Sequence, residues 1–292
     1  MISNTVLIVP VHNRGQTTRS FLLCIEPLIT KGVSVVVFDD GSTDNTQLIL
    51  ASFSDNLDIL RGDGTHYWGG SINKCLDYVN HKYPKTESLI LCNDDVFIPD
   101  STIARIYKIL DDGDNISSII CAYSIDSESK RVTHSGSRRT HFGALNEKPG
   151  LGLSICDLQS SVKEKEPINF VPGRLTIIKN FQKVRNLRIP EKVCHYGADT
   201  IYFAKIAQKG FCCYLDRNMM VYLETKMTGL NSDSVKLTLT ERFRSLNSIK
   251  SSNNLWTRVL VGWYVGEDWL DRISLITSGV LKALITALLV FR

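Results

Sequence analysis

Two clusters of carboxylates follow apolar runs in the first third of the chain. Residues 39–44 read Asp-Asp-Gly-Ser-Thr-Asp, and residues 93–95 read Asn-Asp-Asp. If both runs are parallel strands, the clusters lie at one edge of a sheet, where α/β proteins bind ligands. Adjacent carboxylates repel each other unless a cation joins them, and their oxygens suit Mg²⁺ or Mn²⁺. We therefore expect Asp95, together with Asp94, to hold a metal ion that bridges a diphosphate.

The first cluster suits the rest of a nucleotide. We expect Asp39 to accept hydrogen bonds from a base or ribose, because it ends a different strand from Asp95. A simpler alternative is that residues 39–44 only form a turn that caps the next helix, where Asp, Ser and Thr are favoured. The matching cluster on a later strand favours the ligand site.

The segments that must position these clusters alternate between strand and helix patterns. Apolar runs predict strands at residues 6–9, 33–38, 57–60 and 88–92. Helical spacing predicts helices at residues 16–25, 45–53, 72–81 and 101–110. This alternation favours βαβ units on a parallel sheet, and the continuous apolar runs indicate that both sheet faces are covered.

The pattern changes after residue 117. We expect a mixed region with mobile loops and strand-like pieces at 117–123 and 168–171, then a helix over 199–209 that ends at Gly210. Late strands are predicted at residues 211–215 and 219–223. The predicted fold is therefore α/β, with a central mixed, mostly parallel sheet flanked by helices and a C-terminal helical appendage. We place the catalytic domain at residues 1–225 and the helical segment at 226–292.

The helical segment is strongly apolar near its end. Residues 273–291 hold 13 apolar residues out of 19. On a helix, one stripe is Ile273, Ile276, Val280, Ala283, Leu284, Ala287 and Phe291, and a polar stripe is Ser274, Ser278, Lys282 and Thr286. A helix that spans a membrane would not need the polar stripe, whereas an interfacial or docked helix would.

Aromatic and basic residues precede that stripe. They are Trp256, Trp263, Tyr264 and Trp269, with Arg242, Arg244, Lys250 and Arg258. Such residues beside an apolar helix favour binding to an anionic membrane surface. The alternative is a helix that packs on its own domain or on a second subunit.

Composition excludes several classes of protein. The chain has 292 residues and a formal charge of only +4, which does not suggest a nucleic-acid binder. Its eight cysteines include no Cys-x-x-Cys pair, so zinc spacing is absent and a reducing cytosol is indicated. The N-terminus lacks the basic region of a signal peptide, and no dinucleotide or Walker-type glycine motif occurs. Polar surroundings predict that His66 and His134 are surface residues.

Four motifs in order resemble glycosyltransferase family 2. They are Val-Pro-Val-His-Asn-Arg at 9–14, Val-Phe-Asp-Asp-Gly-Ser-Thr-Asp at 37–44, Leu-Cys-Asn-Asp-Asp-Val at 91–96 and His-Tyr-Gly-Ala-Asp at 195–199. The resemblance covers residues 5–225. It implies the GT-A fold of inverting enzymes, many of which build bacterial surface polysaccharides.

The resemblance also implies roles for single residues. The nucleotide pocket would be lined by Pro10, Val11, His12, Asn13 and Arg14, with Asp39 on the base and Asp94 near the ribose. Asp95 would be the metal ligand of a DXD-type motif in which Asn93 replaces the first Asp. Asp199 matches the catalytic base, although an aspartate there would also cap a helix.

Two further segments are implied near the diphosphate. Trp68 and Gly70 belong to a Gly-containing stretch before a helix, and Arg174 would bind the diphosphate or an acidic acceptor. A surface arginine is the alternative for Arg174. The late histidine that many relatives use for the metal is missing, so Glu224 or water would complete the site.

The parts predict an inverting transfer of a sugar from a nucleotide-sugar donor to a hydroxyl of a lipid-linked bacterial surface glycan. Asp199 would remove the hydroxyl proton, and Mg²⁺ or Mn²⁺ would stabilise the leaving diphosphate. We expect a cytoplasmic enzyme, peripheral on the inner face of the cell membrane, for which an oligomer is possible. The alternatives are a non-catalytic scaffold of a polysaccharide assembly complex, which needs no metal, and a sugar-phosphate nucleotidyltransferase, which releases pyrophosphate.

Overall fold

The apolar runs of the first third form the parallel half of a large sheet. In the computed structural model, β1 pairs in parallel with β2 and β4, and β2 pairs in parallel with β3. Their bounds are β1 Thr5–Val11, β2 Ser34–Asp39, β3 Asp58–Arg61 and β4 Ser88–Cys92. All four strands were predicted from their apolar runs, and the prediction is confirmed.

The structure describes residues 4–113, 116–139, 146–223, 238–248, 251 and 253–288. Glu224, the candidate for the remaining metal ligand, lies outside the described residues. Lys250 and Phe291 of the C-terminal segment also lie outside them.

The second half of the sheet is built around an antiparallel strand. Across the described residues the main sheet has nine strands in the order β3-β2-β1-β4-β10-β5-β11-β9, with β6 paired to β5. The added bounds are β5 Ser118–Asp126, β6 Val132–His134, β9 Lys165–Pro167, β10 Leu175–Lys179 and β11 Cys212–Leu223. Strand β10 runs antiparallel to both β4 and β5. The mixed, mostly parallel sheet is therefore confirmed.

Two predictions in this half are corrected. Residues 168–171 are not a strand: Phe170 forms only an isolated bridge with Ser137, and the strand β9 lies just before it. The two predicted late strands are one strand, β11, with a register shift between Leu215 and Met220. The polar residues 216–218 lie at the shift and interrupt the apolar run, which explains why the sequence pattern reads as two pieces.

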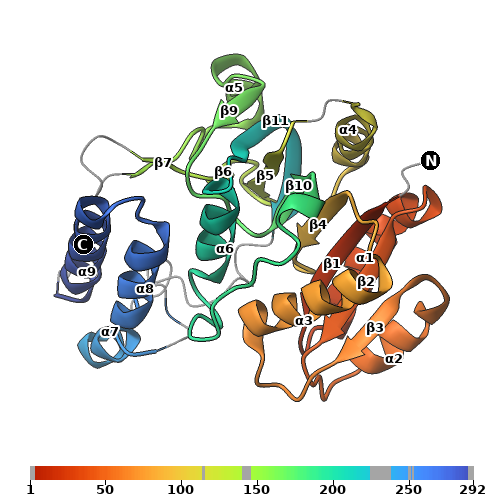
Figure 1. Cartoon of the computed structure of the whole chain (residues 1–292), viewed down its shortest axis with the longest axis horizontal. Coiled ribbons are helices and arrows are strands. Elements are labelled where there is room, and N and C mark those ends of the chain that lie inside the picture. The colour runs from red at the N-terminus through yellow and green to blue at the C-terminus, as the bar shows by residue number, and fades with distance from the viewer. Residues whose placement is uncertain are drawn as a thin grey trace.

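Helices cover both faces of the sheet (Figure 1). On one face lie α1 Gly15–Thr30, α2 Thr46–Ala51 and α4 Asp100–Asp111, and on the other lie α3 Tyr67–Lys82 and α6 Ala198–Ala207. Alternate side chains of β1 enter the two cores: Leu7 and Val9 pack with α1, and Val6 and Ile8 pack with α3. Strands buried on both faces follow from this sandwich.

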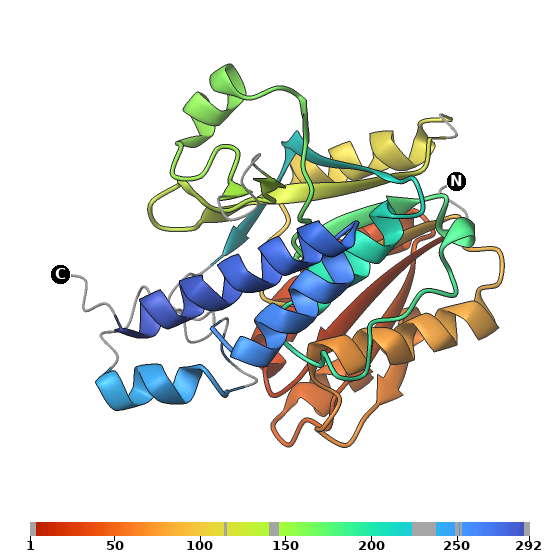
Figure 2. The ribbon, with the colours of Figure 1, turned by 60° about the vertical axis from the view of Figure 1, so that its left-hand side comes forward.

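The C-terminal helices form a further layer beside α6 (Figure 2). They are α7 Leu239–Ser245, α8 Leu255–Val265 and α9 Trp269–Leu288. Leu260 and Val265 of α8 and Leu275 of α9 belong to the same buried cluster as α3 and α6. The hairpin of α8 and α9 is therefore packed on the sheet layer through shared core residues.

Helix α9 buries a narrow face of small residues and exposes a broad apolar one. Leu275, Ala283 and Ala287 are buried, whereas the large side chains of the opposite face are exposed. The exposed set is Leu270, Ile273, Leu281, Ile285 and Leu288. The predicted apolar stripe is therefore only partly buried, because Ile273 is 52% exposed whereas Ala283 is fully buried. Within the described residues, no helix has the length and hydropathy needed to cross a membrane.

Candidate active site

The loops after β1 and β2 are fastened to each other by side-chain hydrogen bonds. The backbone N–H of Asn13 donates to the Ser42 hydroxyl at 2.8 Å, and the Asn13 side-chain oxygen accepts from the Thr43 N–H at 2.7 Å. The N–H of Arg14 donates to Thr46 Oγ1 at 3.1 Å. Asn13 holds a positive φ of 50°, which Asn tolerates better than most residues. These contacts fix the β1 loop beside the carboxylate cluster 39–44.

Three residues predicted to line the nucleotide pocket differ in exposure. Val11 is buried, and its carbonyl accepts the N–H of Asp40 at 3.0 Å, so its side chain belongs to the core. Pro10 is half-buried at the end of β1. His12 is exposed, and its Nδ1 lies 2.6 Å from the Asp40 carbonyl oxygen.

Asp39 is buried at the end of β2. Its Oδ1 accepts the Ser42 N–H at 2.9 Å, so the turn described as the simpler alternative does form. Among the described residues no donor reaches its other carboxylate oxygen. Asp39 therefore has one oxygen committed to the turn and one that is not.

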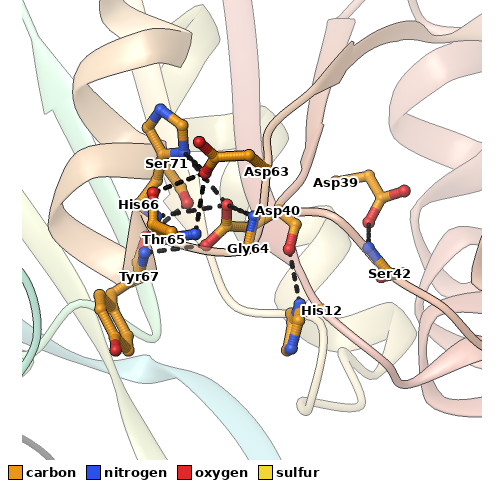
Figure 3. A network of polar contacts seen from close by, with 10 residues as sticks. All are labelled: His12, Asp39, Asp40, Ser42, Asp63, Gly64, Thr65, His66, Tyr67 and Ser71. Atoms are coloured by element: carbon orange, nitrogen blue, oxygen red, sulfur yellow. Dashed lines mark hydrogen bonds and ion pairs between the residues drawn. The ribbon is translucent and has the colours of Figure 1, made fainter.

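Asp40 anchors the start of α3 (Figure 3). Its Oδ2 accepts the Tyr67 N–H at 2.8 Å, and its Oδ1 accepts the Gly64 N–H at 3.0 Å and lies 3.2 Å from His66 Nδ1. Oδ1 of Asp63 lies 3.3 Å from the same ring nitrogen. His66 is thus half-buried in a network, so its prediction as a surface residue was wrong. Gly70 lies one turn into α3 and donates its N–H to the His66 carbonyl.

Asp40, Asp63 and His66 have ligand atoms within 4.8 Å of one another, a donor set that suits Mn²⁺. This set was not foreseen, although the Asp-x-x-His spacing after β3 is a visible signal. Asp40 Oδ1 is already occupied by N–H donors, and Asp63 is 69% exposed. Asp40, Asp63 and His66 are therefore a weaker candidate for the metal site than the carboxylates at the end of β4.

Arg14 joins the two carboxylates at the end of β4. Its Nη1 lies 3.3 Å from Asp94 Oδ1 and 3.4 Å from Asp95 Oδ2. The Thr18 hydroxyl donates to Asp94 Oδ2 at 2.8 Å, a contact that the sequence did not indicate. Burial raises the pKa of Asp94 to about 6, despite the opposing effects of Arg14 and Thr18. The positive charge of the Arg14 guanidinium therefore offsets the repulsion between the two carboxylates.

Asp95 fits a metal ion better than its neighbour. Its Oδ1 is buried and has no hydrogen-bond partner among the described residues. Asp94, by contrast, has both oxygens engaged by Arg14 and Thr18. A buried anionic oxygen without a donor is unfavourable unless a cation reaches it. The carboxylate chemistry of Asp95 therefore fits Mg²⁺ or Mn²⁺.

Trp68 connects the end of β4 to the candidate base. Its Nε1 donates to Asn93 Oδ1 at 2.9 Å. A Cβ atom added to Gly173 would lie 2.9 Å from Trp68 Cζ2 and 3.1 Å from Asp199 Cβ. Trp68 and Asp199 thus both approach Gly173 closely, and glycine is required for that approach.

Asp199 lies in the first turn of α6 and accepts three hydrogen bonds. Oδ2 accepts the Gly173 N–H at 3.2 Å, and Oδ1 accepts the Thr200 N–H at 2.7 Å and its hydroxyl at 3.4 Å. Burial raises the pKa of Asp199, although these bonds and the charge of Arg174 act in the opposite direction. A carboxylate with a raised pKa is a stronger base than an ordinary aspartate.

Arg174 stands between the two carboxylate centres. Burial lowers its pKa, while the charges of Asp95 and Asp199 oppose that change. Its Nη1 is buried without a hydrogen-bond partner in the described part of the chain, and its carbonyl accepts the Asn93 N–H at 3.0 Å. Arg174 is therefore not a plain surface arginine. Burial, together with the charges of Arg174 and Lys148, lowers the pKa of His134 to about 4. His134 is therefore not the surface residue that its polar sequence surroundings predicted.

The contacts form one continuous arrangement across three strand ends. Arg14 contacts Asp94 and Asp95, and the charges of Asp95 and Asp199 both act on the buried Arg174 guanidinium. The predicted site residues therefore converge, with Val11 the exception because its side chain is in the core.

Comparison with known proteins agrees with this fold and site. The sequence model of glycosyl transferase family 2 matches residues 6–165, so the chain belongs to this family and is a glycosyltransferase. No curated protein sequence matches the chain.

Solved structures share the fold at low sequence identity. A mannosyltransferase from Pyrobaculum calidifontis in complex with GDP-Man and Mn²⁺ is 17% identical, with a TM-score of 0.58 over 97% of this chain and 72% of that one. Residues 1–349 of S. aureus TarS in complex with UDP-GlcNAc are 14% identical, with a TM-score of 0.57 over 97% and 72%. GalNAc-T7 with UDP, GalNAc and Mn²⁺ is 12% identical, with a TM-score of 0.52 over 75% and 43%. The chain therefore has the GT-A fold.

Proposed function

We propose that this glycosyltransferase moves a sugar from a nucleotide-sugar donor to an acceptor hydroxyl by a single displacement that inverts the anomeric carbon. The observation that carries the proposal is Asp199, a carboxylate with a raised pKa held by the Gly173 and Thr200 N–H groups. An alcohol is a poor nucleophile, so a base must take its proton as the bond forms. A non-catalytic scaffold would have no use for a carboxylate kept at the cost of burial.

The donor would be held by the two loops and by the end of β4. Asp39 has an uncommitted carboxylate oxygen for the base or ribose, and Arg14 and Arg174 offer positive charge to the diphosphate. We assign Asp95 as the metal ligand because its buried Oδ1 has no donor among the described residues. A bound Mg²⁺ or Mn²⁺ would neutralise charge on the leaving diphosphate. The Mn²⁺ complexes of the mannosyltransferase and GalNAc-T7 support this choice of ion.

The acceptor we propose is lipid-linked, because the C-terminal layer suits a membrane surface. Nine of the 15 exposed large hydrophobic side chains in the described residues lie between 243 and 288. They are Phe243, Trp256, Trp263, Trp269, Leu270, Ile273, Leu281, Ile285 and Leu288. Exposed tryptophans with arginines such as Arg244 nearby are typical of a headgroup interface. We therefore propose that the enzyme works on the inner face of a membrane, at a growing surface glycan.

A panel of nucleotide sugars tests the reaction. The full chain is incubated with each donor, with and without Mn²⁺, and slow hydrolysis is followed by release of the nucleoside diphosphate. We expect one donor to be cleaved in a metal-dependent way, and NMR to find the released sugar or its transfer product with inverted anomeric configuration. Retention of configuration would reject the single displacement, and cleavage of no donor would reject the assignment.

A further inference from the structure

Three aromatic side chains form a connected group beside the candidate base. The rings of Tyr67 and His195 lie 6.0 Å apart in an edge-to-face arrangement, and the rings of His195 and Tyr196 lie 4.8 Å apart. All three side chains are partly exposed. We call Tyr67, His195 and Tyr196 the aromatic platform.

The platform is fixed to the reaction centre from two sides. The Gly69 N–H donates to the Cys194 carbonyl at 2.7 Å, which ties the start of α3 to the segment that carries His195 and Tyr196. Trp68, the residue after Tyr67, contacts Gly173 and lies beside Asp199. The Gly69–Cys194 hydrogen bond therefore joins the two segments that carry the platform.

Tyr67 is held in place by the network around Asp40. It has a positive φ of 52°, which is unfavourable for a bulky residue and must be imposed by its surroundings. Asp40 accepts its N–H at 2.8 Å, and Figure 3 shows its ring pointing away from that network. The ring is thus presented outward, toward the segment that carries His195.

Tyr196 lies on the side of the platform near the charged groups. Its phenol is close enough to Arg174 for the two groups to influence each other, and Arg174 in turn interacts with Asp199 and Asp95. Tyr196 also precedes Asp199 by only three residues, so a molecule resting on the platform would lie near the start of α6, where the candidate base is found. Arg14, which we propose for the diphosphate, lies 3.3 Å from Asp94 and 3.4 Å from Asp95.

We propose that the aromatic platform is the acceptor subsite and that it binds a pyranose ring through the apolar C–H face of the sugar. Aromatic faces carry negative electrostatic potential and attract the weakly positive C–H groups of a ring laid on them. A pyranose with one face on the platform keeps its hydroxyls at the rim, where one of them meets Asp199. The inference rests on the proposed function and specifies the acceptor as a sugar rather than a protein side chain or a bare lipid.

Saturation-transfer NMR on the full chain tests the subsite. The probes are methyl pyranosides of glucose, galactose, rhamnose, mannose and N-acetylglucosamine, added with UDP or GDP and diamagnetic Mg²⁺ while protein aromatic protons are irradiated. We expect one or more glycosides to receive saturation on the ring protons of one face. Tyr196→Leu and Tyr67→Leu should each reduce that signal at least fivefold, whereas Tyr196→Phe, which keeps the ring, should retain it.

Tyr107→Leu is the matched control, because Tyr107 lies on α4 and donates its hydroxyl to the Pro27 carbonyl away from the site. It should leave the glycoside signal unchanged. If no glycoside is saturated, or both leucine variants keep the signal, the platform is not the acceptor subsite. Saturation of the nucleotide in the same samples separates the two proposals: its absence would reject the donor site itself, whereas nucleotide binding with an unaltered glycoside signal would reject only the platform.

Discussion

The backbone N–H of Gly173 donates to Oδ2 of Asp199 at 3.2 Å, and the missing side chain of Gly173 leaves the space in which the Trp68 ring lies. One residue therefore orients the candidate base and admits the tryptophan that ties it to Asn93. Gly173 therefore holds one oxygen of the Asp199 carboxylate, and Thr200 holds the other.

Gly173→Ala should reduce kcat by roughly 10²-fold, because displacement of a reacting group by about 1 Å has an effect of that size. The added Cβ would lie 2.9 Å from Trp68 and 3.1 Å from Asp199, so one of them must shift. Steady-state kinetics measures the loss. Gly113→Ala is the control, since a Cβ there meets no atom within 4 Å; equal kinetics for the two variants would contradict the positioning role.

Asp199→Asn should lower turnover by about 10²–10⁴-fold, the usual contribution of a general base. Nucleotide affinity should change little, since the nucleotide-side contacts of Arg14 and Asp39 are elsewhere. Calorimetry with the nucleoside diphosphate and a transfer assay measure both quantities on the same preparation. Full turnover in this variant would show that another group takes the proton.

The acid limb of the pH–rate profile should lie above the ordinary aspartate pKa of 3.8, because burial raises the pKa of Asp199 and the base must be ionised. Arg174→Gln removes a charge that lowers this pKa, so the limb should move further toward alkaline pH. Arg174→Lys keeps the charge and should restore the limb in part. A profile that is identical in wild type and Arg174→Gln would rule out Asp199 as the titrating base.

The raised pKa of Asp199 makes stability change with pH in the opposite direction to activity: activity rises with pH, whereas the contribution of Asp199 to the free energy of unfolding falls. Protonation of Asp199 favours the folded state, so its contribution is complete below pH 3.8 and is lost as pH rises through the raised pKa.

Asp95→Asn should weaken nucleotide-dependent Mn²⁺ binding by at least about tenfold. Loss of a residue that only supports a metal ligand already weakens metal binding by about 10–100-fold, and Asp95 is proposed as a ligand itself. Electron paramagnetic resonance of free Mn²⁺ gives the affinity. Asp63→Asn is the matched variant from the alternative set with Asp40 and His66, and it should change the affinity little. If Asp63→Asn weakened Mn²⁺ binding more than Asp95→Asn, the metal would have to be assigned to Asp40, Asp63 and His66 instead.

Membrane binding should depend on the exposed apolar side chains of α8 and α9. Trp256, Trp263, Leu281 and Ile285 are all more than two-fifths exposed, so replacing the four by Ser should spare the fold. Partition to anionic liposomes should fall at least about tenfold, since burying even one such side chain contributes roughly 1.5–3 kcal/mol. Leu48→Ser, at an exposed site on α2, should bind like wild type. Flotation that is unaffected by the quadruple change would reject the membrane surface.

The parallel half of the fold was predictable because its strands are continuous apolar runs followed by carboxylates. The antiparallel strand β10 was not predicted: a strand was expected at residues 168–171 instead of 175–179, and no local pattern indicates pairing with β4 and β5. Pairing partners depend on tertiary packing that a local pattern does not encode.

The candidate site divides in the same way. Asp95 and Asp199 were found by residue type and motif position, whereas the bridging role of Arg14 was not, because it needs two segments 80 residues apart to meet. The Asp40 network was missed because its hydrogen bonds are mostly to backbone N–H groups, which leave no mark in the sequence.

Helix α8 lies directly against the turn that begins α6. Gly197 there has a φ of 78°, and a Cβ on it would lie 2.8 Å from Val261 and 3.1 Å from Thr257. The hairpin of α8 and α9 thus packs directly behind Gly197, two residues before Asp199. Replacing the C-terminal helices would therefore also require new packing behind the peptide that precedes Asp199, the base we propose, because α8 fills that space.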